Sequence, residues 1–476
     1  MARPSGRAIA PLIAPRGTHL SVRSVHVCQQ CGAESPKWSG QCPSCGAWNT
    51  LVETVVPKGP GGRATPTRSR SLRVDAIAQP IAAVSSAESE RLRSGLGEVD
   101  RVLGGGFVPG SIVLVGGDPG IGKSTLLLQL AARLAGAGQG VLYVTGEESA
   151  AQVRGRAERI GAVVDRLDLL PTTDLATAVV AIEAARPSLA VVDSVQTLAS
   201  DELGGPAGSV GQVREVASRL AEVAKGGRTC VALVGHVTKE GTVAGPRTLE
   251  HLVDAVLYLE GERLFGTRLL RAAKNRFGST EEVGVLEMAG DGLTEVADAS
   301  RFFLADGGEA VAGSAVTIAL EGTRPLAVEI QALVAPAGYG TPRRATTGVD
   351  VNRVLMLIAV LARHAGANLT GHDVYVNVAG GLRIVEPAAD LAIAVALASS
   401  LRERPVVAGT VLAGEVALSG RLRAAGRGDR RLSEARRLGF ERLVTGPERG
   451  RRSGASGGTA EAPDIRTALE LALDIG

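Results

Sequence analysis

The sequence predicts an α/β protein built around a nucleotide-binding loop, with a metal-binding knuckle before it and an α+β domain after it. Three features support this prediction: two C-x-x-C pairs near the N-terminus, a glycine-rich loop between an apolar run and an apolar helix, and alternating strands and helices over residues 96–284. A chain of 476 residues is expected to hold about three domains. Its 45% hydrophobic and 21% charged residues are typical of globular proteins, and the net charge of +3 identifies no partner.

Residues 1–25 carry four arginines and no acidic residue. We expect them to form a disordered basic leader. A start codon assigned too far upstream and an organelle transit peptide also fit this composition. No apolar run in the chain approaches the roughly 18 residues of a membrane-spanning helix, so we expect no membrane association.

Four of the five cysteines form two closely spaced pairs, Cys28 with Cys31 and Cys42 with Cys45. Two C-x-x-C turns can present four thiolates tetrahedrally, which favours a structural Zn²⁺ site over residues 26–50. A redox dithiol and an iron–sulfur site are the alternatives. A segment with so few apolar residues would take its folding free energy from the metal, typically about 10–16 kcal/mol. Reduced cysteines indicate a reducing compartment, so we expect a cytoplasmic protein.

Residues 51–95, which are rich in Pro, Gly, Ser and Arg, are expected to form a flexible basic linker. From residue 96 to 284, apolar runs alternate with helical patterns, which predicts a mostly parallel, doubly wound sheet with its ligand at the carboxyl ends of the strands. The expected strands are 111–116, 140–145, 189–193, 229–235, 254–260 and 267–273, and the expected helices are 122–136, 149–160, 174–185 and 210–225.

The glycine-rich stretch fits the phosphate-binding pattern G-x-x-x-x-G-K-[ST]. Its glycines let backbone N–H groups approach a triphosphate, and the following helix adds its positive N-terminal end. Lys123 would place a charge on the outer phosphates, and the Ser124 hydroxyl could ligate Mg²⁺. The pattern therefore predicts a nucleoside triphosphate on residues Gly117, Asp118, Pro119, Gly120, Ile121, Gly122, Lys123, Ser124 and Thr125.

Acidic residues follow two neighbouring strands. Asp193 ends an apolar strand, the pattern of a Walker B acid that holds Mg²⁺ through water. Glu147 and Glu148 end another strand, where a carboxylate could orient and deprotonate an attacking water. They could instead cap the helix that starts near Ser149.

Three further polar residues follow strand ends. His236 could report the state of the nucleotide to the loop 238–248, or be a plain structural residue. Lys274 and Arg276 end the last strand as a pair of cations. Such a pair is either a solvated edge or a group that reaches the nucleotide of a neighbouring subunit.

Several motifs in this order resemble the bacterial RadA (Sms) family. They are the four-cysteine knuckle, the stretch Leu-Gly-Gly-Gly-Phe-Val-Pro-Gly, the phosphate loop, Gly-Glu-Glu-Ser, and Lys-Asn-Arg-Phe-Gly at 274–278. The resemblance implies a RecA-like ATPase core, a hexameric ring and ATP hydrolysis stimulated by DNA. It also implies action with the RecA recombinase in homologous recombination and repair, on single-stranded and branched DNA.

The resemblance assigns roles to individual residues. Lys123, Ser124 and Asp193 would hold MgATP, Glu147 would be the catalytic base, and Lys274 with Arg276 would act across subunits. Loop 238–248 would contact DNA in the ring channel.

Residues 285–476 resemble a Lon-protease-like domain, with helices expected at 350–365 and 388–401 and strands at 373–378 and 411–416. A Lon-type protease needs a Ser–Lys pair, but Ala388 stands where the Ser is expected and no Lys follows Lys274. We therefore expect no proteolysis. Residues 421–452 hold eleven Arg against four acids, which is either a DNA-binding face or a solvated helix face.

Two other classes of function remain open at this point. One is a RecA-fold signalling or timing ATPase that binds proteins, and the other is an adaptor whose ring is only locked by ATP. Neither would be a motor on DNA.

Overall fold

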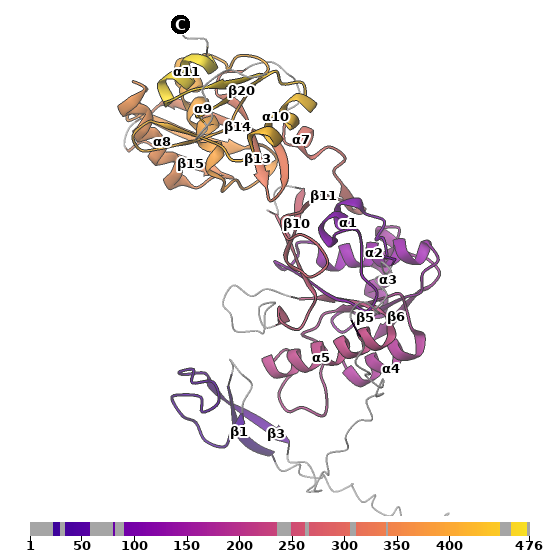
Figure 1. The fold of residues 1–476 in the computed structure, drawn as a ribbon. Helices are drawn as coiled ribbons and strands as arrows, with labels where there is room; N and C mark the ends of the chain where they lie inside the picture. The colour runs from indigo at the N-terminus through magenta and orange to yellow at the C-terminus, as the bar shows by residue number, and fades with distance from the viewer. Residues whose placement is uncertain are drawn as a thin grey trace, which may run out of the picture.

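A computed structural model describes residues 22–28, 34–57, 80, 90–235, 249–261, 266–304, 311–338, 341–447 and 458–473 of the chain. They form a three-stranded sheet near the N-terminus, a nine-stranded sheet, and a seven-stranded sheet with a small two-stranded sheet beside it (Figure 1). Cys31, His236 and the loop 238–248 lie outside the described residues.

The nine-stranded sheet has the order β12-β11-β10-β9-β4-β8-β7-β5-β6. The six strands from β9 to β6 are parallel, and β9 through β12 pair antiparallel. Its strands are β4 Ile112–Gly117, β5 Val141–Thr145, β6 Leu167–Pro171, β7 Leu189–Asp193, β8 Cys230–Val234, β9 Ala255–Glu260, β10 Thr267–Asn275, β11 Val283–Ala289 and β12 Gly292–Glu295.

Helices cover both faces of this sheet, as the expected doubly wound fold requires. Helices α1 Gly97–Leu103, α2 Lys123–Gly136 and α3 Ala150–Arg159 pack on one face, and α4 Leu175–Ala185 and α5 Val210–Gly227 on the other. Strand β4 shows the reason. Alternate side chains point to opposite faces, so Val113 and Val115 join the first cluster while Ile112 and Leu114 join the second. The fold class predicted from the sequence is confirmed.

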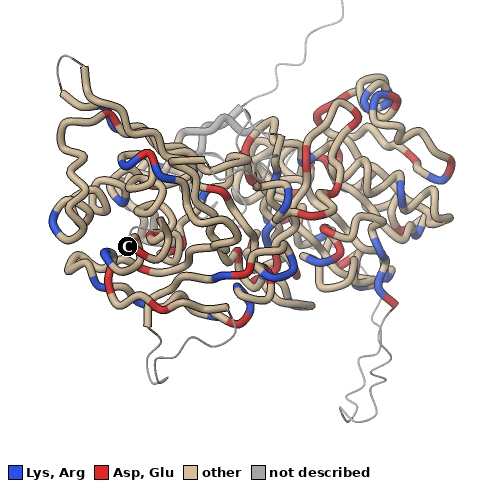
Figure 2. Tube along the Cα trace, turned by 90° about the horizontal axis from the view of Figure 1, so that it is seen from above, with Lys and Arg blue, Asp and Glu red and all other residues tan. Residues whose placement is uncertain are grey.

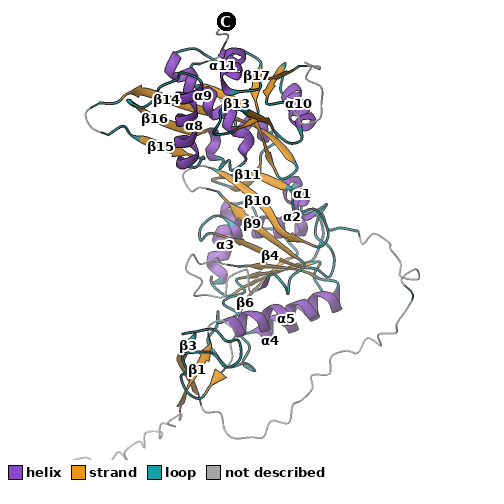
Figure 3. Ribbon diagram, turned by 60° about the vertical axis from the view of Figure 1, so that its left-hand side comes forward, coloured by secondary structure: helices purple, strands orange, loops and turns teal. Residues whose placement is uncertain are grey.

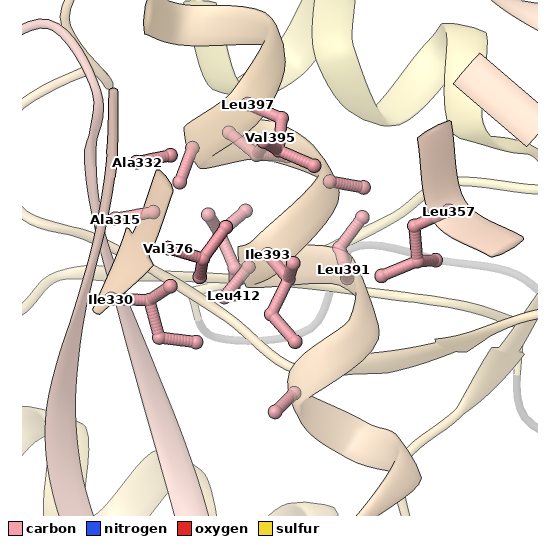
Figure 4. Packing of buried hydrophobic residues seen from close by; sticks show 14 of the residues in the cluster. Ala315, Ile330, Ala332, Leu357, Val376, Leu391, Ile393, Val395, Leu397 and Leu412 are labelled. Atoms are coloured by element: carbon pink, nitrogen blue, oxygen red, sulfur yellow. The ribbon is translucent and has the colours of Figure 1, made fainter. Parts of the chain in front are cut away.

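The C-terminal part is a mixed sheet with the order β15-β16-β14-β13-β17-β20-β21. One face packs on α8, α9 and α11, and the other on α10. The elements are β13 Ser314–Glu321, β14 Arg324–Pro336, β15 Arg344–Thr347, α8 Val351–His364, β16 His372–Val378, α9 Asp390–Arg402, β17 Thr410–Leu412, α10 Gly428–Arg437, β20 Arg442–Thr445, β21 Thr459–Glu461 and α11 Ile465–Leu473. Figure 4 shows α9 at the centre of this core, with Val395 and Leu397 near Ala332 of β14, and Leu391 facing Leu357 of α8.

Several expected boundaries differ from the observed ones. The range expected as one strand, 411–416, is two strands in different sheets, β17 and β18 Gly414–Val416, and β18 pairs with β19 Leu422–Ala424. Strands β1 Val22–Cys28 and β3 Leu51–Pro57 pair along their length and extend the N-terminal module into the ranges expected to be leader and linker. β1 also pairs with β2 Glu34–Ser35.

The nine-stranded sheet also crosses the boundary expected at residue 284, because β11 spans this boundary, β12 follows it, and both belong to this sheet. Leu269, Val283 and Val285 at this end of the sheet share a hydrophobic cluster with the C-terminal domain. The two large sheets are thus joined through β10 and β11, as Figure 3 shows.

Charges are interspersed along the chain in Figure 2 rather than separated into regions. The arginines of 421–452 illustrate this mixing, because most of the described ones bond to acidic side chains or backbone carbonyls elsewhere in the chain. Arg427 pairs with Glu281, Arg431 with Glu386, and Arg437 with Asp298. None of the described helices is both long and apolar enough to span a membrane.

Candidate nucleotide and zinc sites

The phosphate loop joins the carboxyl end of β4 to the start of α2. Three of its glycines, Gly117, Gly120 and Gly122, have φ angles of 146°, 76° and 117°, which other residues rarely adopt. A Cβ on Gly117 would lie 2.4 Å from the carbonyl oxygen of Leu259 on β9. The loop therefore needs glycine both for its backbone conformation and for close packing against the neighbouring strand.

The side chain of Lys123 lies inside this loop and is only 4% exposed. Its Nζ donates hydrogen bonds to the carbonyls of Gly117 at 2.9 Å and Asp118 at 3.0 Å. Burial lowers the pKa of Lys123, and the nearby carboxylates of Asp193, Glu147 and Asp118 oppose that shift. The loop thus holds a desolvated cation whose field is available to an anionic ligand.

Asp193 ends β7 beside Tyr143 of β5. The Tyr143 hydroxyl donates to Asp193 Oδ2 at 2.6 Å, and burial followed by this carboxylate raises the pKa of Tyr143 well above its usual value. The other oxygen, Asp193 Oδ1, is buried and has no hydrogen-bond partner among the described residues. An unpaired buried carboxylate oxygen is costly, and a hydrated Mg²⁺ is the ligand that would satisfy it here. The site therefore fits the metal predicted from the sequence.

The structure separates the two neighbouring glutamates. Glu147 is exposed and accepts a 2.6 Å hydrogen bond from Ser194 Oγ, and its charge acts on Lys123. Glu148 instead forms an ion pair with Arg156 of α3. The alternative that these glutamates cap α3 is wrong, because Ser149 is the N-cap and forms a capping box with Gln152.

Lys274 and Arg276 do not meet this group of residues. In the sheet register, Asn275 pairs with Ala255, and Ala255 pairs with Val113, four residues before Gly117 on β4. Lys274 itself pairs with Val256, and Val256 pairs with Leu114, so at about 3.3 Å per residue the KNRFG motif starts roughly 10 Å from Gly117 along the strand direction, towards the amino ends of the parallel strands. Lys274 Nζ donates to the carbonyls of Glu250 and Val253, and Arg276 pairs with Asp254 at 3.0 Å.

Sequence reasoning missed two residues that touch the site. Tyr143 lies within the expected strand 140–145, and its hydroxyl reaches Asp193 on the neighbouring strand β7. Arg268, on β10, donates from Nε to the carbonyl oxygen of Ile121 in the phosphate loop at 3.1 Å. No local pattern reveals Arg268, because the contact joins residues 147 positions apart.

The N-terminal module gathers cysteine sulfurs. The Sγ atoms of Cys28, Cys42 and Cys45 all lie within 4.8 Å of one another, and Cys28 and Cys45 are 3.7 Å apart. Two thiolates on one tetrahedral Zn²⁺, each about 2.3 Å from the metal, are about 3.8 Å apart. The sulfur geometry therefore fits a shared zinc ion, with Cys31 as the remaining predicted ligand.

Comparisons with known proteins agree with these sites. Residues 26–53 match a family model described as "Rubredoxin metal binding domain", and residues 79–242 match one described as "AAA domain". The protein "DNA repair protein RadA" of Bacillus subtilis is 49% identical over 422 residues, which cover 89% of this chain and 92% of that protein. The chain belongs to the RadA family of DNA repair proteins.

Other members of the RadA family show the same similarity. The RadA proteins of Halalkalibacterium halodurans and Pseudomonas aeruginosa are 50% and 49% identical, and cover 88% and 89% of the chain. The solved "ATPase Domain of G40P" matches 44% of the chain and 94% of its own length, with 14% identity and a TM-score of 0.39. Within the RadA family, this chain combines a zinc ribbon with a P-loop ATPase domain.

Proposed function

We propose that this chain is a DNA-dependent ATPase that acts in homologous recombination and repair. In this role it translocates on single-stranded DNA and promotes branch migration together with RecA. The observation that carries the proposal is the convergence of Lys123, Asp193 and Glu147 at the carboxyl edge of the sheet, in a member of the RadA family. This edge is where doubly wound sheets bind nucleotides.

Each residue of this edge has a part in binding or hydrolysis. The loop from Gly117 to Thr125 holds the phosphates, and Lys123 exchanges its two carbonyl partners for phosphate oxygens. Ser124 and Asp193 would hold Mg²⁺, which neutralises charge on the phosphates when it is bound. Glu147 is positioned by Ser194 to accept a proton from the attacking water, whereas Glu148 serves structure through Arg156.

The opposite edge of the sheet supports the proposal that Lys274 and Arg276 act across subunits. Neither residue lies at its own phosphate loop, yet Arg276 keeps a side chain that is 55% exposed. A head-to-tail ring places the carboxyl edge of one subunit against another surface of its neighbour. In a hexameric ring, the carboxyl edge of one subunit would bind the nucleotide, and Arg276 at the opposite edge of its neighbour would reach that nucleotide. Lys274 would hold the backbone that carries Arg276.

The arginines of 421–452 give only limited support for a DNA-binding face. Arg430 donates to the carbonyl of Thr323, and Arg423 pairs with Glu415, so these side chains also have partners within the protein. We propose instead that DNA passes through the ring channel near loop 238–248, which lies outside the described residues. We also propose that the C-terminal domain is Lon-protease-like without protease activity, since Ala388 is buried where a nucleophile would stand.

The decisive experiment measures ATP turnover with and without single-stranded DNA, at several salt concentrations, together with the mass of the assembly by light scattering. We expect DNA to stimulate turnover, more weakly as salt rises, in a particle of six subunits. A signalling ATPase or an adaptor would turn over ATP at the same rate with and without DNA. A monomer under every nucleotide condition would contradict the ring.

The zinc ribbon has a separate test. We propose that Cys28, Cys31, Cys42 and Cys45 hold one Zn²⁺, consistent with a reducing, cytoplasmic setting. Among the side chains that the structure describes in this module, the buried hydrophobic cluster consists of Cys28, Cys42 and Leu51, so two of the proposed ligands belong to its core. Cys28→Ser should lose zinc and unfold the module while the ATPase core stays folded. The matched control is Cys230→Ser, which should keep its zinc, and full zinc occupancy in Cys28→Ser would contradict the proposal.

A further inference from the structure

Strand β10 is shared between two cores, because its alternate side chains point in opposite directions. Thr267, Leu269 and Arg271 face the C-terminal domain: Leu269 belongs to the cluster of that domain, and Arg271 pairs with Glu321 at 2.7 Å. Arg268 and Leu270 face α2 and the phosphate loop instead. One strand therefore touches both the nucleotide site and the C-terminal domain.

On the nucleotide side, Arg268 is a buried cation, 5% exposed, and burial lowers its pKa. Its Nη1 donates to the carbonyl of Thr267 at 2.8 Å, which fixes the guanidinium so that Nε reaches the Ile121 carbonyl. Gly261, which directly follows β9, approaches so closely that a Cβ there would lie 3.1 Å from Arg268 Cδ. The guanidinium is thus held by its own backbone and by tight packing.

The contact has a consequence for phosphate binding. A trans peptide is planar, so the carbonyl of Ile121 and the N–H of Gly122 point in opposite directions. When Arg268 holds the Ile121 carbonyl on the β10 side, the Gly122 N–H is aimed away from β10. Backbone N–H groups are the donors that a phosphate loop offers to its ligand, so Arg268 fixes the aim of one of them.

On the other side of β10, Thr267 Oγ1 donates to the carbonyl oxygen of Gly380 at 3.1 Å. Gly380 follows β16, and a Cβ there would lie 2.5 Å from a ring carbon of Phe303, so this segment is closely packed within the C-terminal domain. Two adjacent residues, Thr267 and Arg268, therefore bond to the C-terminal domain and to the phosphate loop respectively.

We propose that β10 couples the C-terminal domain to the nucleotide site, with Arg268 as a positioning residue for the phosphate loop and Thr267 as the anchor on the domain. The effect on ATP rests on the proposed ATPase function. The effect on the loop itself does not, and it can be measured without nucleotide.

The first experiment compares Arg268→Ala and Arg268→Lys in the full chain. Loss of a buried, charged donor should raise the KM for ATP about tenfold with a smaller change in kcat, and speed hydrogen exchange of the 116–125 amides. Arg268→Lys keeps a cation and a donor, so it should recover most of the KM. The matched control is Arg133→Ala on α2, whose guanidinium also donates to a backbone carbonyl, that of Gly95, and which should behave as the parent.

Two results would overturn the role of Arg268. One is unchanged KM and unchanged loop exchange in Arg268→Ala. The other is a fall in kcat at constant KM, with exchange raised across the whole core, because this means only that fewer molecules are folded. Since the exchange comparison needs no nucleotide, it decides the role even if the parent protein fails to hydrolyse ATP.

The second experiment tests the anchor. Thr267→Val keeps the side-chain shape but removes the bond to Gly380, and should raise exchange of the 116–125 amides and the KM for ATP about two- to threefold. The control is Thr410→Val, which removes a buried hydroxyl that has no partner among the described residues. If Thr267→Val and Thr410→Val give the same loop exchange, the coupling through β10 is refuted.

Discussion

The nine-stranded sheet carries different chemistry at its carboxyl edge, where the parallel strands end, and at its opposite edge, where they begin. At the carboxyl edge, Lys123 lies buried among the carboxylates of Asp193, Glu147 and Asp118, so charges of both signs are concentrated in one place. At the opposite edge, Lys274 donates hydrogen bonds to two backbone carbonyls, and Arg276 forms an ion pair with Asp254. This contrast underlies the proposal that the carboxyl edge binds the nucleotide and that Lys274 and Arg276 act on the nucleotide of a neighbouring subunit.

The largest effect is expected at the carboxyl edge. Lys123→Ala should lower turnover by about 10²–10³-fold or more, as loss of a buried electrostatic group does in other enzymes. The fold should persist, because the buried charge of Lys123 is itself costly to hold. Phosphate release and thermal unfolding measure the two effects. Lys225→Ala, at the exposed end of α5, is the control, and parental turnover in Lys123→Ala would place the site elsewhere.

Arg276→Ala tests the opposite edge. Nucleotide binding should stay within about twofold of the parent, because Arg276 has a side chain that is 55% exposed and pairs with Asp254 rather than with the phosphate loop. Turnover should fall on the order of tenfold or more, as expected for a cation that stabilises the transition state. Mixing Arg276→Ala subunits with Lys123→Ala subunits should restore part of the activity, since some boundaries then join two intact edges. A mixture no more active than its components would contradict action between subunits.

A smaller effect concerns alkaline pH at the carboxyl edge. Burial lowers the pKa of Lys123 below its ordinary value of 10.5, so the cation is lost as pH rises through that lower value. Affinity for ATP should therefore begin to fall before an ordinary lysine would titrate, and we expect a loss of several-fold. Fluorescent-nucleotide titrations from neutral to alkaline pH measure this. Lys123→Arg should remove the decline, and constant affinity up to pH 10.5 would show that the charge of Lys123 is not used.

The smallest effect lies away from both edges, at Asp298 and Arg437. Hydrogen bonds from Arg437 lower the pKa of Asp298 to about 2. A lowered carboxyl pKa adds stability above the unfolded value of 3.8, and this stability is lost as pH falls towards 2. Because Arg437 is half exposed, we expect less than about 1 kcal/mol. Urea unfolding of Asp298→Asn should show a weaker dependence on acid, with ATP turnover unchanged; an equal dependence would contradict the assignment.

The features that can be predicted from the sequence depend on residues that lie close together along the chain. The phosphate loop, the strand ending at Asp193 and the C-x-x-C pairs each depend on a spacing of a few positions. The structure places the loop and this strand as expected, and it brings together the sulfurs of the three described cysteines, Cys28, Cys42 and Cys45. Strand β6 was missed because its residues are only partly buried and carry no strong alternation. The range 411–416 was read as one strand because its apolar run continues through Ala413, where the chain changes sheets.

The remaining features depend on contacts between distant residues. Arg431 belongs to a run of arginines that the sequence offers as a surface, yet it is buried against Glu386 and the carbonyl of Ile318. Arg268 likewise has no sequence signal, because its partner Ile121 lies on another strand–helix unit. Glu147 accepts a hydrogen bond from Ser194, whereas Glu148 pairs with Arg156. No local sequence pattern connects either partner to its glutamate.

The last two strands of the large sheet limit how this protein can be shortened. Gln129 of α2 exchanges hydrogen bonds with the backbone of Leu293 on β12, and the methyl carbon of Met288 on β11 packs against Gly122. A protein truncated near residue 284 would lose both of these contacts with α2 and the phosphate loop. Studies of the isolated ATPase domain should therefore keep the chain to Glu295 at least.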